Sequence, residues 1–322
     1  MNEHTNDDNV ISFELGQKRE RIVNGVGNLF DSDDPQQITY SHSVMCQTSM
    51  PFKNEKGVER WEVRNGRSIM VIRAGEVYDP NKDAMVQLGL PYGTKPRLIL
   101  LDWNRQAVLN QSPIIEVEDS LYAFLKRLKL PAEGRVYTMA KKQLSALAAS
   151  HMTIGQANQA GGKTGYRKIV SDMNILFSKD ENQRVLWPNT VKYSDEYFES
   201  LMRHAVPLDE GALYLLKDSA LELDLYAMFA ERLHRIDPKQ PKFMLWAGLW
   251  EQYGKGYKRI DNFRRRFLHH LLNVRAVYHD ANIEEISSKG GMPKGLFLKH
   301  SKPPVAKLIV TVAKAVEKPV EG

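Results

Sequence analysis

Two hairpin patterns, each preceded by a run of helices, constrain the fold of this chain most strongly. Each hairpin is predicted from two short apolar runs that flank a loop with three glycines, in residues 152–177 and again in residues 283–299. The helices before them are predicted from apolar spacing at residues 96–110, 119–128 and 135–150, and at 195–204, 209–217, 221–233, 246–253 and 257–278. Because helices followed by a hairpin are typical of a winged helix, the sequence predicts an α+β fold with two tandem winged-helix domains.

The ends of the chain differ in composition from the segment between them. Residues 1–36 carry three basic and eight acidic side chains and close on Asp31-Ser32-Asp33-Asp34-Pro35, so we expect a flexible acidic tail with one short helix near residues 18–23. Pro303-Pro304 ends the second hairpin pattern. We therefore expect an amino-terminal tail (1–36), a first winged-helix domain (37–185), a second one (186–302) and a carboxy-terminal tail (303–322).

The charge outside the acidic tail favours a polyanionic partner. Residues 37–322 hold 42 lysines and arginines against 31 acids, an excess of about 11. Cys46 is the single cysteine, which excludes an internal disulfide and a thiolate metal cluster within one chain. The start lacks a signal-peptide pattern, and no stretch approaches ~18 consecutive apolar residues. A cytoplasmic protein that does not span a membrane is expected.

The helix predicted at 257–278 is the strongest candidate for reading DNA. Ile260, Phe263, Phe267, Leu271 and Val274 are spaced to form a buried face. The predicted DNA-binding residues lie on or beside the opposite face, and they are Lys258, Arg259, Asn262, Arg265, Arg266 and His269, with Lys289 and Lys294 added from the following loop. Arginine pairs with guanine and asparagine with adenine in the major groove, while lysine neutralises phosphate. A merely solvated face is the alternative, but residues 239–302 hold thirteen basic and five acidic residues.

The helix at 135–150 repeats this pattern more weakly. Its inward side is predicted to hold Val136, Met139, Ala140, Gln143 and Leu147, whereas Thr138, Lys141, Lys142 and the flanking Arg135 face outward. Lys163, Arg167 and Lys168 add positive charge to the hairpin that follows. These residues are predicted to contact DNA, and the alternative is that this domain serves as a surface for homodimer formation.

The patterns of nucleotide-binding and nicking enzymes are not matched. Gly162-Lys163-Thr164 resembles part of a P-loop, but the position that requires glycine is Ala157, and the segment joins two predicted strands. A nicking enzyme needs two metal-binding histidines separated by one residue, whereas His269 and His270 are adjacent and diverge on a helix. We therefore predict no catalytic set, no cofactor and no metal, and expect that the protein is not an enzyme.

Several longer stretches resemble the plasmid-encoded RepA replication initiator family. They are residues 41–48 (SHSVMCQT), 89–97 (GLPYGTKPR), 115–121 (IEVEDSL), 185–188 (VLWP) and 197–208 (YFESLMRHAVPL), and the similarity extends over about residues 40 to 302. The resemblance implies a tandem winged-helix initiator that binds repeated double-stranded sequences (iterons) at a plasmid origin. It also implies melting of the adjacent duplex and recruitment of host initiation factors or helicase. A winged-helix transcriptional repressor without initiation activity is the alternative.

Overall fold

The computed structural model describes residues 17–27, 37–79, 83–118, 120–157, 164–177, 186–286 and 294–305. Besides a helix over residues 17–27, the helices are α2 (Ser43–Gln47), α3 (Thr94–Asn110), α4 (Leu121–Arg127), α5 (Gly134–Ala149), α6 (Asp195–His204), α7 (Glu210–Leu216), α8 (Ala220–Arg232), the 3-10 helix η2 (Leu233–Arg235), α9 (Trp246–Tyr253) and α10 (Ile260–Val277). The strands are β1 (Ile38–His42), β2 (Arg60–Asn65), β3 (Ser68–Arg73), β4 (Glu76–Asp79), β5 (Ala84–Gln87), β6 (Ile114–Glu116), β7 (His151–Ala157), β8 (Thr164–Lys168), β9 (Val170–Phe177), β10 (Leu186–Tyr193), β11 (Ala205–Asp209), β12 (Lys242–Leu245), β13 (Ile283–Ile286) and β14 (Gly295–Leu298).

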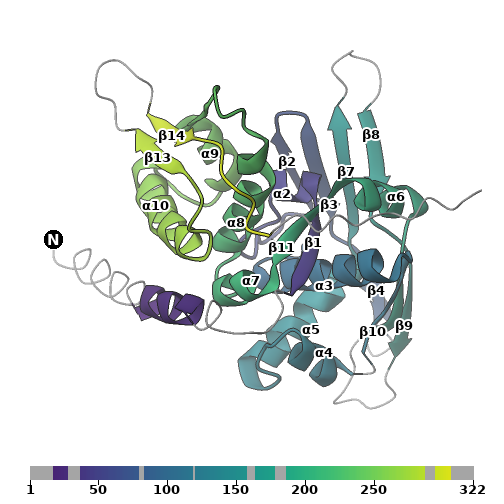
Figure 1. The fold of residues 1–322 in the computed structure, drawn as a ribbon. Coiled ribbons are helices and arrows are strands. Elements are labelled where there is room, and N and C mark those ends of the chain that lie inside the picture. The colour runs from purple at the N-terminus through teal and green to yellow at the C-terminus, as the bar shows by residue number, and fades with distance from the viewer. Residues whose placement is uncertain are drawn as a thin grey trace, which may run out of the picture.

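The strands form small antiparallel sheets, so the predicted α+β class is confirmed at this level. The larger sheet has the order β2-β3-β7-β8, and two three-stranded sheets have the orders β6-β10-β9 and β12-β14-β13. The pairs β1-β11 and β4-β5 complete the described sheets. Figure 1 shows α8, α9, α10 and the β13-β14 hairpin on one side of the molecule and the β2-β3-β7-β8 sheet on the other.

Two hydrophobic cores divide the chain. The first core runs from Val44 to Leu201 and contains the inner faces of β2, β3 and β7 together with α3 and α5. The second runs from Val206 to Leu298 and also takes Cys46 from α2. The cores therefore change over between Leu201 and Val206, whereas the sequence analysis placed the boundary at residue 185. The reason is that β10 pairs with β6 and β9 of the first core.

The strand β1, which precedes the first core in sequence, pairs with β11, which follows it. It pairs antiparallel with β11, from Ile38 opposite Asp209 to His42 opposite Ala205. His42 then caps α2, because its Nδ1 accepts a hydrogen bond from the Val44 backbone N–H at 3.1 Å. Its Nε2 lies 3.0 Å from the Ser200 hydroxyl of α6. Burial, with smaller contributions from His204 and Arg167, lowers the pKa of His42 to about 3. The imidazole is therefore neutral at neutral pH, as the cap requires.

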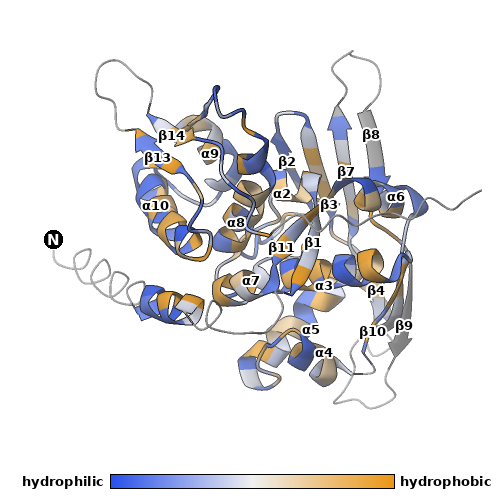
Figure 2. Ribbon diagram, viewed as in Figure 1, coloured by the Kyte–Doolittle hydropathy of each residue, from blue (hydrophilic) through white to orange (hydrophobic). Residues whose placement is uncertain are grey.

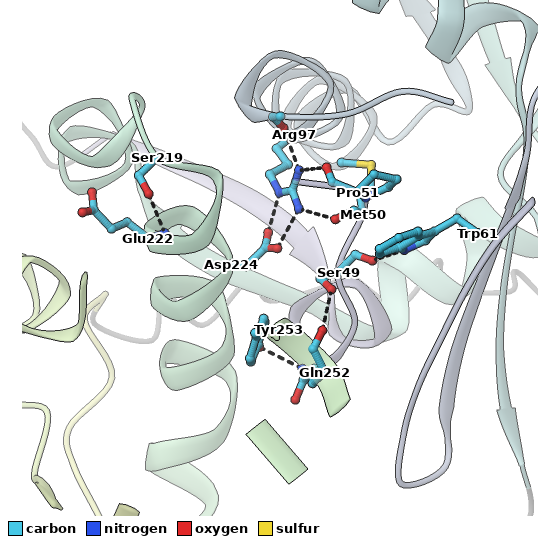
Figure 3. A network of polar contacts seen from close by, with 11 residues as sticks. Ser49, Met50, Pro51, Trp61, Arg97, Ser219, Glu222, Asp224, Gln252 and Tyr253 are labelled. Carbon is cyan, nitrogen blue, oxygen red and sulfur yellow. Dashed lines mark hydrogen bonds and ion pairs between the residues drawn. The ribbon is translucent and has the colours of Figure 1, made fainter. Parts of the chain in front are cut away.

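A buried ion pair connects the two cores. Arg97 of α3 directs its guanidinium at Asp224 of α8, with Nε 2.6 Å from Oδ1 and Nη2 2.8 Å from Oδ2. The same guanidinium donates to the backbone oxygens of Met50, Pro51 and Gly93. Figure 3 shows Arg97 reaching toward both Asp224 and the Met50-Pro51 backbone. Since Arg97 is only 5% exposed, this pair fixes α3 against α8 away from water.

Part of the predicted amino-terminal tail packs on the second core. Residues 17–27 form a helix, which contains the helix expected at 18–23. Ile22 is fully buried in the second core, and Lys18 lies 2.6 Å from the Glu222 carboxylate of α8. Arg21 pairs with Asp218 at 2.5 Å. The prediction of a flexible tail is therefore wrong for this helix, because one apolar side chain and two ion pairs dock it. The remaining residues of that tail lie outside the described ranges.

The first predicted hairpin differs from the one observed. We expected residues 169–177 to return against 152–154, but β7 pairs with β8, and β9 pairs with β10 in another sheet. Ile169, which is fully buried and donates its backbone N–H to the Met152 oxygen at 3.0 Å, lies between β8 and β9. The β7-β8 hairpin is also not isolated, because β7 pairs with β3 along its length. The second hairpin, β13-β14, occurs as predicted but gains β12 as a third strand.

Candidate nucleic-acid interface

The helix α10 is anchored by an aromatic cluster. Phe263 and Phe267 are fully buried, and each packs edge-on against Trp246 of α9, with ring centroids 6.2 and 5.3 Å apart. Trp250 and Tyr257 contact Phe263 from its other sides, both at 5.5 Å. Such pairs contribute roughly 0.5–1.5 kcal/mol each beyond the area they bury. The predicted buried face is confirmed for Phe263 and Phe267, and for the remaining core positions Leu271 and Val274.

A buried carboxylate adds a polar anchor to the same helix. Glu222 of α8 accepts a hydrogen bond from Asn273 Nδ2 at 2.7 Å and lies 2.9 Å from His270 Nδ1. Lys18 contacts its other oxygen. Burial acts to raise the pKa of Glu222, but the bonds from His270 and Lys18 outweigh it and hold that pKa below its ordinary value. The charged carboxylate therefore ties α10, α8 and the amino-terminal helix together. In Figure 2, α10 carries both hydrophobic (orange) and hydrophilic (blue) residues, as expected for a helix with one buried and one exposed face.

The predicted DNA-binding residues of α10 lie on the surface. Lys258, Arg259, Asn262 and Arg265 are exposed, whereas Arg266 and His269 are half-buried. Arg259 forms an ion pair with Asp261 at 3.1 Å, and Arg265 contacts the Asn262 amide oxygen at 3.4 Å. The structure thus gathers the basic and amide side chains toward the amino-terminal half of one helix.

Ile260 does not belong to the buried face that the spacing predicted. It is 43% exposed because it is the first residue of α10, one turn before the helix packs against Trp246 through Phe263. Sequence reasoning also missed Leu268 and Leu272, which line a shallow groove along α10 together with Asp261, Arg264, Arg265 and His269. Leu272 is 39% exposed. A count at 100° per residue places Leu272 near Arg265, so the signal was available.

Arg264 links α10 to the β13-β14 hairpin. Its guanidinium reaches Glu285 of β13 at 2.5 Å and lies over the Trp246 ring at 5.8 Å. Arg264 therefore holds the hairpin against α10, and it is half-buried, unlike the exposed basic side chains Lys258, Arg259 and Arg265. Lys294 is exposed at the start of β14, and its backbone oxygen accepts from the Trp246 N–H at 3.2 Å. Lys289 lies outside the described residues.

The residues predicted on the earlier helix form a separate group. On α5, Arg135, Thr138 and Lys142 are exposed and Lys141 is half-buried. Ala140, Gln143 and Leu147 are buried as predicted, with Val136 and Met139 half-buried. Figure 1 shows α5 and α10 in different parts of the molecule, so the structure does not combine the two predicted sets into one surface.

Arg167 does not lie on the outer side of its hairpin. It is half-buried on β8, opposite Ile154, whose side chain is fully buried in the first core. Its charge lowers the pKa of both His42 and His204, in each case as a smaller effect than burial. The prediction that Arg167 contacts DNA is therefore not supported by its position, because side chains alternate between the two faces of a strand. Lys163 lies outside the described residues.

The described residues were also searched for metal ligands, for a reactive cysteine and for membrane-spanning helices. Within the described ranges, no three His, Cys, Asp or Glu side chains come together as metal ligands. Cys46 is buried, and burial raises the pKa of its thiol. No helix in this part of the chain has the length and apolar content that crossing a bilayer requires.

Comparison with known sequence families gave a match to part of the chain. Residues 90–247 match the sequence model of the family described as plasmid encoded RepA protein. Over this range, just under half of the chain, the sequence is similar to the plasmid-encoded RepA family. The matched range contains α3 to α8 with the Arg97–Asp224 pair and ends at the start of α9. This similarity supports a role as a replication initiator.

The chain was also compared with curated proteins and with solved structures. No curated protein matches the chain. Two crystal structures of RctB domains 2 and 3 align with it at 12% sequence identity. The first has a TM-score of 0.46 and covers 80% of this chain and 95% of that one. The second has a TM-score of 0.44 and covers 80% of this chain and 96% of that one.

Proposed function

We propose that this protein initiates plasmid replication by binding repeated double-stranded sequences at an origin. The exposed basic and amide side chains of α10, held on a rigid aromatic core, carry the proposal. Lys258, Arg259, Asn262 and Arg265 are of the types that contact phosphates and base edges. The protein acts by binding rather than by catalysis, melts the adjacent duplex and recruits host replication proteins in the cytoplasm.

The order of elements around α10 supports a winged-helix module. Helix α8 is followed by β12, α9, α10, β13 and β14, and the strands form one antiparallel sheet. In a helix-turn-helix the second helix enters the major groove with its amino-terminal residues at the base edges. Helix α9 and the turn at Gly254 take the place of the first helix and the turn, so α10 is the recognition helix.

Selection of bound duplexes from a random library tests the binding step. The full chain is expected to enrich one motif, and to bind it at least about 10³-fold more tightly than a shuffled duplex at physiological salt, without nucleotide or metal. Arg265→Ala or Asn262→Ala should each cost about 1–3 kcal/mol on that motif and relax the preference at one base position. Lys126→Ala on α4 is the matched exposed control, because Lys126 is in neither predicted DNA-binding set. Failure to enrich any motif would overturn the proposal.

A plasmid test separates an initiator from a transcriptional repressor. Supplied in trans, an initiator sustains a vector that carries only the origin, whereas a repressor binds the same motif and does not. The Arg265→Ala variant should lose this activity in proportion to its lost affinity. Sequence-specific binding without replication support would favour the repressor.

A further inference from the structure

The sheet β2-β3-β7-β8 has a basic outer face. Because strand side chains alternate, the register assigns Trp61, Val63, Met70, Ile72, Met152 and Ile154 to the inner face, and all six are buried in the first core. The opposite face is the outer sheet face. Its charged and imidazole side chains, Arg60, Glu62, Arg64, Arg73, His151 and Lys168, surround the apolar β3 residues Ile69 and Val71, which are buried. Among these, Glu62 is the one acid.

The placement of these side chains is unfavourable for the isolated protein. Arg60 lies directly opposite Arg73, and Arg73 lies directly opposite His151. Like charges directly opposite each other, as Arg60 and Arg73 are, destabilise a sheet. Glu62 is already engaged with Arg60 and with Arg64, the latter at 2.8 Å. Within the described ranges, the side chains of Arg73, His151 and Lys168 form no hydrogen bond or ion pair. The face therefore presents basic groups for which the fold supplies no anion.

The edge strand β2 of this sheet adjoins the turn before α10. Lys255, in the turn before α10, donates to the Glu62 backbone oxygen of β2 at 2.9 Å and lies 4.3 Å from the centre of the Trp61 ring. Asn65 of β2 donates to the Gln252 side chain at 3.1 Å. In Figure 1, β2 is the strand of this sheet that lies toward α9. Lys255 is thus placed beside the edge strand of the basic sheet.

We propose that the outer sheet face is a second phosphate-binding surface, which holds the duplex that flanks the site read by α10. The proposal rests on the DNA-binding function proposed above and extends it to the first core. Four strands at about 4.8 Å span about 14 Å. At about 3.4 Å per base pair, this corresponds to roughly four base pairs of flanking duplex. A flat sheet face does not enter a groove as a helix does, so these contacts go to phosphates and add affinity without base preference.

The test compares a sheet variant with a matched control. The sheet variant is Arg73→Gln with Lys168→Gln, and the control is Lys126→Gln with Lys302→Gln, which removes two exposed lysines elsewhere. Each protein is titrated over a salt series with two duplexes, the selected motif alone and the motif with ten added base pairs on each side. Hydroxyl-radical footprints are taken on the longer duplex. Thermal unfolding midpoints of both variants are compared with the wild type to show that they fold.

The expected result is a selective loss on the longer duplex. The sheet variant should bind it several-fold more weakly, with a salt dependence lower by about 0.9 per lost phosphate contact, or about 1.8 in total. Its footprint should shorten by roughly four base pairs on one side. Its affinity for the bare motif and its motif preference should equal those of the wild type. The control should match the wild type on both duplexes.

Two outcomes would overturn the inference and leave the proposed function standing. In the first, the wild type prefers the motif and the sheet variant keeps its affinity, salt dependence and footprint. In the second, the variant loses affinity equally on both duplexes. A wild type that shows no motif preference would instead refute the proposed function.

Discussion

Replacing Asp224 with asparagine tests whether the two cores are held together by a buried charge pair. The substitution keeps the size of the side chain but removes its charge. Arg97 is 5% exposed, and arginine side chains stay charged in proteins, so its guanidinium would be left buried without a counter-ion. Breaking a buried pair in this way costs about 3–5 kcal/mol. Three backbone oxygens still accept from Arg97, which places the expected loss toward 3 kcal/mol.

The assay is urea unfolding of Asp224→Asn, Arg97→Met and the double variant, followed by circular dichroism and tryptophan fluorescence. Arg97→Met should cost at least as much as Asp224→Asn, because it also leaves the Met50, Pro51 and Gly93 oxygens without their donor. The double variant should be more stable than the sum of the single losses predicts, by at least about 1 kcal/mol. Because the pair joins α3 to α8, the single variants should also unfold in two steps.

A loss below about 1 kcal/mol for Asp224→Asn, with one cooperative transition, would refute this reasoning. That outcome would mean that the pair behaves like a surface ion pair. Additive losses in the double variant would likewise show that the two side chains do not depend on each other.

The remaining predictions concern His42 and the amino-terminal helix. The unfolded chain takes up a proton at His42 below about pH 6.5, whereas the folded chain does so only near pH 3. The free energy of unfolding therefore falls by about 1.4 kcal/mol for each pH unit below about 6.5. His42→Asn keeps a capping side chain and should remove this slope from urea unfolding measured between pH 6.5 and 4.5; an unchanged slope would assign it to other groups. Ile22→Ala should cost about 2–3 kcal/mol locally. It is expected to speed amide exchange in residues 17–27 while exchange in α3 stays unchanged, and equal acceleration in α3 would show that the helix is part of the global fold.

The sequence predicted the helices of the second core well because their spacing is regular. Phe263, Phe267, Leu271 and Val274 recur at helical intervals, and all four are buried. The exposed basic side of α10 follows from the same spacing. The predicted burial of Ile260 was wrong because periodicity indicates which side of a helix a residue occupies, and not whether anything packs against that turn.

The sheets were predicted less well because strand pairing depends on residues far apart in the sequence. Nothing local to β9 indicates that it pairs with β10, or that β7 pairs with β3. The outer sheet face was missed for the same reason, since Arg73 and Lys168 come together only through that pairing. The helix at residues 17–27 was expected from its sequence, but its docking depends on Glu222, which belongs to the other end of the chain.

The pairing of β1 with β11 has a consequence for how the chain folds during synthesis. The whole first core lies between these two strands in sequence, so β1 leaves the ribosome long before its partner exists. At about 5–20 residues per second, the wait is on the order of 10 to 30 seconds. During that time β1 exposes an unpaired edge, which is a site for aggregation. The nascent chain is therefore most vulnerable until β11 has emerged, and chaperone binding is expected to concentrate on β1 in this interval.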